Sequence, residues 1–532
     1  MANLTRAEFE SIVARERAAG DARTLATPVC VRLLADHLTP VVAYRRLVAE
    51  DERSAPSFLL ESVEGGERVG RYSILGARPC REAVANEHAV TVRRHHAGAP
   101  ANETVHAGAD PFTILREDAR GYRLVRTPGV PGCFVGGWVG YAAYDSVRFA
   151  EPGKLPFEHA PPDDRGLPVL HFAFYDAVVI FDHVAKAVAV VQLALVEPGA
   201  DAGTAYDAAC AAIRERIALL DRHTEPLRSG EVPTPAPPAP LPSNMTRDQH
   251  AAMVGRALGY IRAGDVFQVV LGQRFERESA ADPFDVYRAL RAVNPSPYMV
   301  YLQAQGCILI ASSPEILCRV EHAEGRLLVT NRPLAGTRRR GRTPDEDTAL
   351  ERDLLADAKE RAEHIMLVDL ARNDVGRVAE PGTIRTPRLM EIERYSHVMH
   401  ISSSVTGLLR PGLDCWDALR AALPVGTISG APKVRAMQII DELEPVRRGP
   451  YGGGLGCVGL DGHMDIALTL RTMVVPLARR HPGTAGQTPW TYHLQAAGGI
   501  VADSNPGDEY QETVNKAAAL ARAIEVAERA FG

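Results

Sequence analysis

The chain has 532 residues, of which 46% are hydrophobic and 24% charged, and its formal net charge is −6. These proportions are typical of folded globular proteins and exclude disordered, collagen-like and coiled-coil proteins. The near balance of 60 basic and 66 acidic residues argues against nonspecific binding to nucleic acids or membranes. The length predicts roughly two to four domain-sized units.

The eight cysteines are spread along the chain, and none forms a C-x-x-C pair. Disulfide scaffolds are short and cysteine-dense, and zinc sites place their ligands close together, so the pattern disfavours both. The first residues contain no apolar stretch of signal-peptide length, and no apolar run is long enough for a membrane helix. We therefore expect reduced thiols in a cytoplasmic protein.

One proline-rich stretch, residues 224–243, divides the chain. It has no periodic apolar pattern, which is typical of a semi-rigid, extended connector. We therefore predict an N-terminal region over residues 1–223, a linker over 224–243 and a C-terminal region over 244–532.

The expected elements follow in chain order. In the N-terminal region, short apolar segments between turns predict strands at residues 57–61, 71–75, 137–141 and 173–181. In the C-terminal region, apolar periodicity predicts helices over 247–263, 283–293, 347–375, 434–443 and 509–530, and strands over 266–271, 299–302, 307–311 and 466–475. Because strands and helices alternate irregularly, the pattern favours α+β layers over a regular βαβ fold.

Two of these helices carry pairs of glutamates three residues apart, Glu360 with Glu363 and Glu509 with Glu512. Residues at this spacing share a helix face, so each helix presents two carboxylates together. Two such helices facing each other suit Mg²⁺, which takes one or two protein carboxylates and leaves positions for water and an anionic substrate. Glutamate-rich helices also commonly turn their acids to solvent, and the spacing alone leaves both interpretations open.

Glycine-rich and basic segments suggest sites for anions. Residues 454–459 satisfy G-x-G-x-x-G, but a hairpin and a strand follow them, so a dinucleotide site is excluded. The glycines of 495–499 either let a small anion approach the backbone or form tight turns. Residues 424–433 precede a helix whose N-terminus favours an anion. Residues 338–342 are expected to form a solvated loop, whereas Arg471, inside an apolar strand pattern, is expected to have a carboxylate partner, internal or bound.

Further motifs occur in one fixed order along the chain. They lie at residues 59–62, 65–73, 136–141, 264–270, 294–299, 312–315, 332–337, 359–377, 395–400 and 427–433, followed by the two glycine-rich segments. With these motifs the chain resembles the chorismate-utilising enzymes, and among them the anthranilate synthase component I family, over most of its length.

The resemblance implies an α+β fold, a layered α/β sandwich built on two large, mostly antiparallel β-sheets flanked by helices. The implied activity is the amination of chorismate at C2 with ammonia, followed by pyruvate elimination to give anthranilate, the first committed step of tryptophan biosynthesis. In this family pattern Glu315 matches the general acid and His400 the residue required for pyruvate loss. Gln268 stands where relatives that add water carry a lysine base, and Ala335 where para-aminating relatives carry a lysine.

The resemblance also assigns binding residues position by position. Glu363 and Glu512 match the direct Mg²⁺ ligands, with Glu360 and Glu509 beside them. The chorismate-binding positions are Gly336, Thr337, Tyr451, Arg471, Ala497, Gly498 and Gly499. A pocket for the inhibitor L-tryptophan matches Ser62, Pro297, Tyr298 and Met299. Two residues depart from the family pattern, because Val69 replaces a tryptophan and Ala497 a glycine.

The chain has neither a G-x-S-x-G nor a G-x-C-x-G motif, so it carries no hydrolase or amidotransferase nucleophile of that type. A separate glutamine amidotransferase subunit, anthranilate synthase component II, is therefore expected to supply ammonia, and the resemblance implies a heterotetramer. The alternatives are aminodeoxychorismate synthase component I, an isochorismate or salicylate synthase, and a tryptophan-sensing binding protein without activity.

Overall fold

The computed structural model describes residues 2–49, 52–62, 70–96, 99–222, 227–231, 240–395, 398–479 and 489–532. Within them the chain forms two β-sheets of twelve strands each. Every strand pair in these sheets is antiparallel except β1 with β7. The predicted α+β class with two large, mostly antiparallel sheets is confirmed.

The first sheet has the spatial order β20 (Gly430–Ala431), β12 (Gln268–Ser279), β24 (Trp490–Ile500), β23 (Thr472–Pro476), β14 (Cys307–Ser313), β13 (Tyr298–Ala304), β2 (Ser57–Glu61), β3 (Tyr72–Ala77), β10 (Ala177–Asp182), β11 (Ala187–Val196), β1 (Thr24–Leu33) and β7 (Tyr122–Leu124). The second has the order β17 (Leu334–Arg339), β19 (Val398–Leu408), β16 (Arg326–Asn331), β15 (Ile316–Ala323), β22 (Met464–Leu468), β21 (Gly454–Gly459), β8 (Gly137–Ala142), β9 (Leu170–Tyr175), β4 (Arg81–Ala85), β5 (Ala89–His96) and β6 (Ala99–Ala107), and β18 (Arg385–Arg394) pairs with β19.

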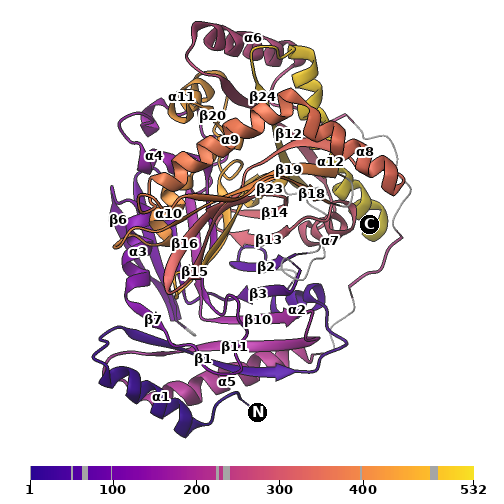
Figure 1. Cartoon of the computed structure of the whole chain (residues 1–532). Helices are drawn as coiled ribbons and strands as arrows, with labels where there is room; N and C mark the ends of the chain where they lie inside the picture. The colour runs from indigo at the N-terminus through magenta and orange to yellow at the C-terminus, as the bar shows by residue number, and fades with distance from the viewer. Residues whose placement is uncertain are drawn as a thin grey trace.

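Helices cover both sheets and one end of the molecule (Figure 1). Apolar side chains on the first sheet pack against α1 (Arg6–Ala18), α2 (Pro40–Leu47), α5 (Ala202–Leu220), α7 (Pro283–Val293) and α12 (Pro506–Phe531). The second sheet packs against α3 (Pro111–Arg120), α9 (Ala358–Gly376) and α10 (Cys415–Ala422). Two further helices, α6 (Arg247–Ala263) and α11 (Lys433–Leu443), pack on the β12 end of the first sheet. The remaining helical segments are α4 (Val147–Ala150), α8 (Pro344–Ala356) and the 3₁₀ turns η1 (Tyr144–Ser146), η2 (Phe157–His159), η3 (Gly426–Ile428) and η4 (Leu477–Arg479).

The two sheets pack face to face through a buried apolar layer. Phe58 and Leu302 of the first sheet meet Tyr141, Tyr175 and Leu455 of the second in this layer. Burying such side chains stabilises the fold by about 1.5–3 kcal/mol for each one. The result is a sandwich with helices outside both sheets, in which the inner layer fixes the distance between the sheets.

Both sheets contain strands from both sides of the predicted linker. In the first sheet Glu61 pairs with Met299, and in the second Ala142 pairs with Gly454. The division into regions 1–223 and 244–532 therefore describes the sequence, while the sheets run through both regions. Most of the predicted linker lies outside the described residues, and its boundaries stay a prediction.

Three predicted elements are divided in the structure, and two of the divisions have a local cause. The strand expected over 173–181 is two strands, because Asp176 interrupts the apolar run and accepts a hydrogen bond from Gln192 as the chain passes from β9 to β10. The helix expected over 347–375 is α8 and α9, because the Asp357 side chain accepts from the amides of Lys359 and Glu360 and so begins a new helix. The strand expected over 466–475 is β22 and β23, which belong to different sheets.

Residues 338–342 do not form the solvated loop that the sequence suggested. Arg338 and Arg339 end strand β17, and Arg338 forms ion pairs with Asp353 and Asp357 at 2.8 and 2.9 Å. Arg340 pairs with Asp347 at 2.8 Å. The acids that surround this segment come from α8 and its junction with α9, so the arginines hold α8 against the second sheet.

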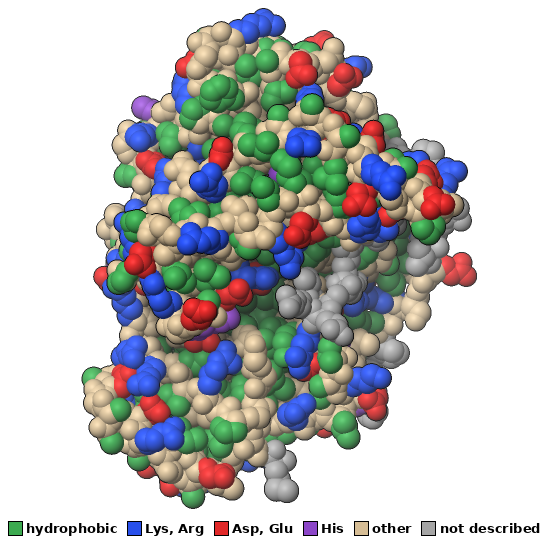
Figure 2. Space-filling model, viewed as in Figure 1, with side chains coloured by type: hydrophobic (Ala, Val, Ile, Leu, Met, Phe, Trp, Pro, Cys, Tyr) green, Lys and Arg blue, Asp and Glu red, His purple; other side chains and the backbone are tan. Residues whose placement is uncertain are grey.

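The surface and the thiols complete the description. Figure 2 shows basic and acidic side chains interspersed over the visible face, without a large patch of one sign. No helix in the described part of the chain has the length and apolar character needed to cross a membrane. All eight cysteines lie in described segments, and each is a free thiol.

Candidate active site

A cavity of about 1080 Å³ is lined by residues of β12 and β24 of the first sheet, of β17 and β19 of the second, and of the helices α9 and α12. Its lining includes most of the residues that the sequence assigned to catalysis, chorismate and metal: Gln268, Glu315, Gly336, Thr337, Glu360, Glu363, His400, Tyr451, Arg471, Ala497, Gly499, Glu509 and Glu512. Gly498 lies against the same wall, since a Cβ atom there would stand 2.9 Å from Glu509 Oε2. The structure therefore brings these residues together in one place.

Glu315 occupies the short connection between β14 and β15, and its side chain is buried. Burial raises the pKa of this carboxyl to about 8, although the hydroxyl of Thr427 donates to Oε1 at 2.9 Å and favours the charged form. Its own carbonyl accepts from the Leu468 amide at 2.9 Å, which anchors the backbone to the start of the β22–β23 connection. The group is protonated at neutral pH and is suited to donate a proton.

His400 lies on β19 and faces the same cavity. Its Nδ1 lies 2.8 Å from the carbonyl oxygen of Gly336, which can only accept, so Nδ1 carries the proton and donates. Burial lowers the pKa of the imidazole to about 4. The ring is therefore neutral at physiological pH, and Nε2 is left as a proton acceptor.

The four glutamates project from two helices into the cavity. Helix α9 begins at the Asp357 cap, and helix α12 begins at Asn505, whose side chain accepts from the amides of Gly507 and Asp508. These caps place Glu360 and Glu509 in the first turns, where the positive end of the helix dipole favours anionic groups, and Glu363 and Glu512 one turn further along.

Their electrostatics show mutual proximity. Burial raises the pKa of Glu363, and the charges of Glu360 and Glu512 raise it further. Burial also raises the pKa of Glu509, and the charge of Glu512 adds to the effect. Carboxyl groups that repel one another in this way are relieved by a bound cation.

The donor set fits a cation that the substrate helps to bind. The Oε2 atom of Glu509 is buried and has no hydrogen-bond partner among the described residues. In the described segments, no three His, Cys, Asp or Glu side chains stand close enough to form a complete ligand set. Mg²⁺ does not require one, because it commonly uses one or two carboxylates together with water and an anionic ligand.

Gln268 on β12 connects the glutamates with the glycine-rich strand β24. Its Nε2 donates to Glu363 Oε1 at 3.3 Å, and its buried Oε1 has no hydrogen-bond partner among the described residues. A Cβ atom on Gly499 would stand 2.4 Å from Gln268 Nε2. Position 499 therefore requires glycine because the Gln268 side chain approaches its backbone closely, and not because of a turn.

Arg471 lies in the connection between β22 and β23, not inside a strand as the sequence suggested. Its backbone has a φ angle of +46°, a conformation that is strained for a residue with a side chain, and its carbonyl accepts from the Ser312 amide at 3.1 Å. The connection carries the chain from the second sheet to the first and turns Arg471 toward the cavity, where a guanidinium can bind a carboxylate with two hydrogen bonds.

The residues assigned to tryptophan do not line this cavity, although Ser296, directly before Pro297, does. Ser62 follows the end of β2 directly, and Met299 pairs with Glu61 of that strand, so Ser62 and Tyr298 are neighbours at the end of the strand pair. The hydroxyl of Tyr298 accepts from Arg319 at 2.8 Å, and the Ser62 hydroxyl is buried with no hydrogen-bond partner in the described segments. Pro297 directly precedes Tyr298, whereas Val69 lies outside the described residues.

Sequence reasoning missed two contributors to the site and misjudged a third. Thr427 belongs to the motif at residues 427–433 but was assigned no role, although its hydroxyl donates a hydrogen bond to Glu315. Lys516 binds Glu512 at 2.6 Å, and its spacing of four residues on one helix is a signal that could have revealed it. Lys433, in the segment suggested for an anion, is buried in an ion pair with Asp374 and is not available.

A family model described as chorismate binding enzyme matches residues 56–522, a range that contains both sheets' central strands and all the residues of the cavity described above, and the chain belongs to that family. The predicted relation to anthranilate synthase component I is confirmed as well, and with it the assignment of the chain as a lyase of the chorismate-utilising enzymes.

The relatives cover nearly the whole chain. Anthranilate synthase alpha subunit 1, chloroplastic, of Oryza sativa subsp. japonica is 52% identical over 512 residues, which are 94% of this chain and 88% of the rice protein. Anthranilate synthase component 1 of Pseudomonas aeruginosa is 44% identical over 505 residues, covering 94% of this chain and 96% of its own length. Among solved structures, anthranilate synthase component I from Streptococcus pneumoniae TIGR4 has a TM-score of 0.69 at 33% identity, covering 92% of this chain and 98% of that one.

Proposed function

We propose that the chain is the large subunit of an anthranilate synthase, which aminates chorismate at C2 with ammonia and then eliminates pyruvate to give anthranilate. The observation that carries this proposal is the opposite protonation of two buried groups in one cavity. Glu315 has a pKa raised to about 8 and His400 a pKa lowered to about 4, so an acid and a base coexist at neutral pH.

Each group suits one step of the reaction. When ammonia attacks C2, the hydroxyl at C4 leaves, and the protonated carboxyl of Glu315 donates the proton that makes it water. The aminated intermediate then loses its C2 proton, and the bond between the ring and the enolpyruvyl oxygen breaks as the ring becomes aromatic. The released enolate takes up a proton to become pyruvate. The neutral imidazole of His400 takes that ring proton.

Binding of chorismate is assigned to the surrounding residues. Arg471 binds a substrate carboxylate, and the backbone of Gly336, Ala497 and Gly499 lets the ring approach closely. Glu363 and Glu512, with Glu360 and Glu509 beside them, would hold Mg²⁺. The bound metal supplies a positive charge for the ring carboxylate.

Gln268 and Ala335 support amination over the rival reactions. Both line the cavity. Water-adding relatives carry a lysine base in place of Gln268, and para-aminating relatives carry a lysine in place of Ala335. Ammonia brings its own lone pair, so a neutral glutamine suffices. Ortho amination, and hence anthranilate as product, is therefore the favoured outcome.

The proposal includes two partners and a compartment. A glutamine amidotransferase subunit, anthranilate synthase component II, supplies ammonia from glutamine. The chain forms a heterotetramer with this subunit. L-Tryptophan binds at Ser62, Pro297, Tyr298 and Met299 and inhibits the enzyme. The chain works in the cytoplasm, although the rice relative is named as chloroplastic.

The test is the fluorescence of anthranilate formed by the purified chain from chorismate, Mg²⁺ and an ammonium salt. Product that disappears with EDTA and with tryptophan supports the reaction, the metal and the inhibition together. Consumption of chorismate without anthranilate fluorescence overturns the proposal. Product mass then distinguishes aminodeoxychorismate from isochorismate, and tryptophan binding without any turnover indicates a binding protein.

A further inference from the structure

Arg448 is a buried charged residue to which the proposed reaction assigns no role, and it lies behind the cavity wall. Its Nε and Nη2 atoms donate to the two carboxylate oxygens of Glu444 at 2.9 and 2.6 Å. Glu444 Oε1 also accepts from the Gly272 amide of β12 at 2.8 Å. Burying such a pair is costly, and the cost is offset only when its hydrogen-bonding capacity is used well.

The remaining donors of Arg448 bind two backbone carbonyls. Nη1 donates to the carbonyl of Ile428 at 2.6 Å, and Nη2 donates to that of Val270 at 2.7 Å. Both Ile428 and Val270 line the catalytic cavity. Arg448 therefore joins the turn η3 to strand β12 from the side that faces away from the substrate.

The turn η3 carries Thr427, the residue that donates to Glu315. Ile428 follows Thr427 directly, so the carbonyl that Arg448 binds lies one residue beyond that donor. Besides Thr427, the backbone amide of Leu334 and the charge of Arg332 also favour ionisation of the Glu315 carboxyl. The position of η3 thus decides whether Thr427 reaches the acid.

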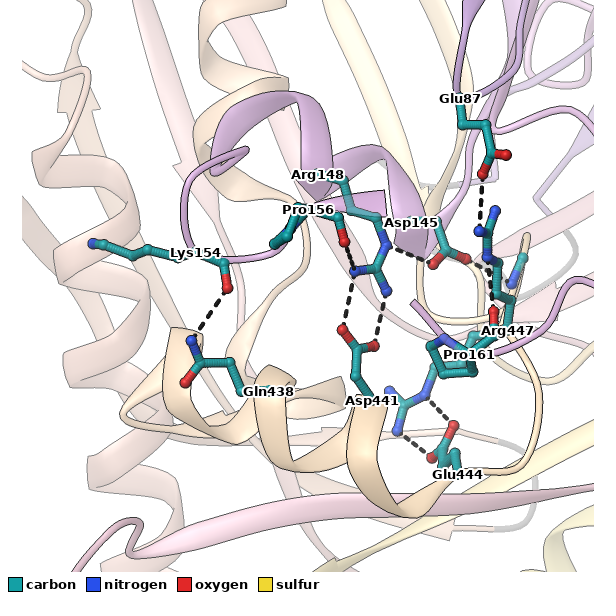
Figure 3. A network of polar contacts seen from close by, with 12 residues as sticks. Glu87, Asp145, Arg148, Lys154, Pro156, Pro161, Gln438, Asp441, Glu444 and Arg447 are labelled. Atoms are coloured by element: carbon teal, nitrogen blue, oxygen red, sulfur yellow. Dashed lines mark hydrogen bonds and ion pairs between the residues drawn. The ribbon is translucent and has the colours of Figure 1, made fainter. Parts of the chain in front are cut away.

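The N-terminal region supports this arrangement. The Tyr144 ring lies under the guanidinium of Arg448, with 4.6 Å between its centroid and Cζ. Figure 3 shows Arg148 between Asp145 and Asp441, and its two bonds to Asp441 measure 2.8 and 3.0 Å. Because Asp441 lies on α11, which ends directly before Glu444, the N-terminal segment fixes the helix end that positions Glu444 against Arg448.

We propose that Arg448 is a positioning residue for the reaction: through the carbonyls of Ile428 and Val270 it holds Thr427 in hydrogen-bonding reach of Glu315. The proposal rests on the proposed function, in which Glu315 is the proton donor. It predicts that Arg448 controls the proton affinity of a carboxyl that it does not touch.

The test compares Arg448→Lys and Arg448→Met with the native chain in the ammonia-dependent reaction, with rates expressed per free ammonia over a range of pH. Without the hydrogen bonds from Arg448 to the carbonyls of Ile428 and Val270, the hydrogen bond from Thr427 to Glu315 is lost. Because that bond favours the carboxylate, its loss raises the pKa of Glu315. The alkaline limb of the pH–rate profile, where the rate falls as Glu315 ionises, then moves up by about one pH unit. Misplacement of the acid lowers kcat by about 100-fold.

Two further variants separate positioning from general structural support. Thr427→Val should produce the same shift of the alkaline limb, and adding Arg448→Lys to it should shift the limb no further, since both act through one bond. Arg447→Met is the matched control: the guanidinium of Arg447 binds the Pro161 carbonyl and Glu87 (Figure 3), so the alkaline limb should stay in place.

The outcomes distinguish the two proposals. An unshifted alkaline limb in a folded Arg448→Lys chain, or an equal shift in Arg447→Met, overturns the role of Arg448. If Arg448→Met does not fold, Arg448→Lys and Thr427→Val still decide the question, because unequal shifts in these two contradict the proposal. Retained activity in Glu315→Gln would instead show that Glu315 is not the proton donor, and the proposed mechanism would then be wrong.

Discussion

The carboxyl group of Glu315 and the imidazole of His400 are both buried in the same cavity, and burial moves their pKa values in opposite directions. A carboxyl is neutral when protonated and an imidazole is neutral when deprotonated, so removal from water favours the acid form of one and the base form of the other. Neither shift could be predicted from sequence, because each depends on burial by strands that are distant in the chain, and at His400 this burial outweighs the opposing hydrogen bond to the Gly336 carbonyl.

Glu315→Gln should lower kcat by about 10²–10⁴-fold, because an amide cannot supply the proton. In the native chain this acid must be protonated, so its contribution is present below the pKa of about 8 and is lost as the pH rises through it. The measurement is the pH profile of anthranilate formation per free ammonia. A flat profile between roughly pH 7 and pH 9, about one unit on either side of that pKa, would contradict the assignment.

His400→Ala should separate the two steps of the reaction. Amination proceeds, since Glu315 is intact, whereas the proton at C2 has no acceptor and pyruvate is retained. Mass spectrometry of the quenched reaction should detect the aminated, pyruvate-bearing intermediate, with tryptophan binding as the check on folding. An unchanged rate of anthranilate formation would contradict the role assigned to His400.

At the scale of elements, the predictions were good where local signals act alone. The predicted helices over 247–263 and 283–293 coincide with α6 and α7, each of which begins at a capping side chain. The predictions failed where a long-range choice divides an apolar run. Leu468 and Thr472 lie on different sheets, and nothing in the intervening residues specifies this change.

The helix pair α9 and α12 yields a prediction about the metal. Glu512→Ala should abolish Mg²⁺-dependent turnover while leaving tryptophan binding intact, because the inhibitor residues lie outside the cavity. Isothermal calorimetry with tryptophan and the fluorescence assay measure the two effects. Glu528→Ala on the same helix is the control, since Glu528 binds Arg277 and Ser279 and does not line the cavity. Full activity in Glu512→Ala would disprove the metal assignment.

The spacing of residues in the sequence could not show that the site residues meet in one cavity. The glutamate pairs were recognisable as shared helix faces, but the sequence left open whether they face solvent or each other. The family resemblance supplied that choice, and the structure places both pairs on one cavity. The partners Thr427 and Arg448 were not predicted, because their importance comes from contacts between segments far apart in the chain.

At the scale of the whole molecule, the two sheets determine what can be removed. A chain of residues 244–532 contains every assigned catalytic and metal residue, yet it lacks β2 and β8, the partners of β13 and β21. We expect this fragment to lose cooperative thermal unfolding and all activity, because exposed strand edges and the open inner layer promote aggregation. Differential scanning calorimetry is the measurement, with equimolar addition of residues 1–223 as the comparison. A folded, active fragment would show that the regions are independent.

The same sharing of sheets governs the order in which the chain can fold during synthesis. When residue 223 leaves the ribosome, β2 and β8 are complete, but their partners β13 and β21 begin only at Tyr298 and Gly454. Until then each sheet ends in an unpaired edge, and the apolar layer between them lacks Leu302 and Leu455. Native contacts of such long sequence separation close late and slowly. The nascent N-terminal region must therefore stay protected from aggregation until nearly the whole chain has been made.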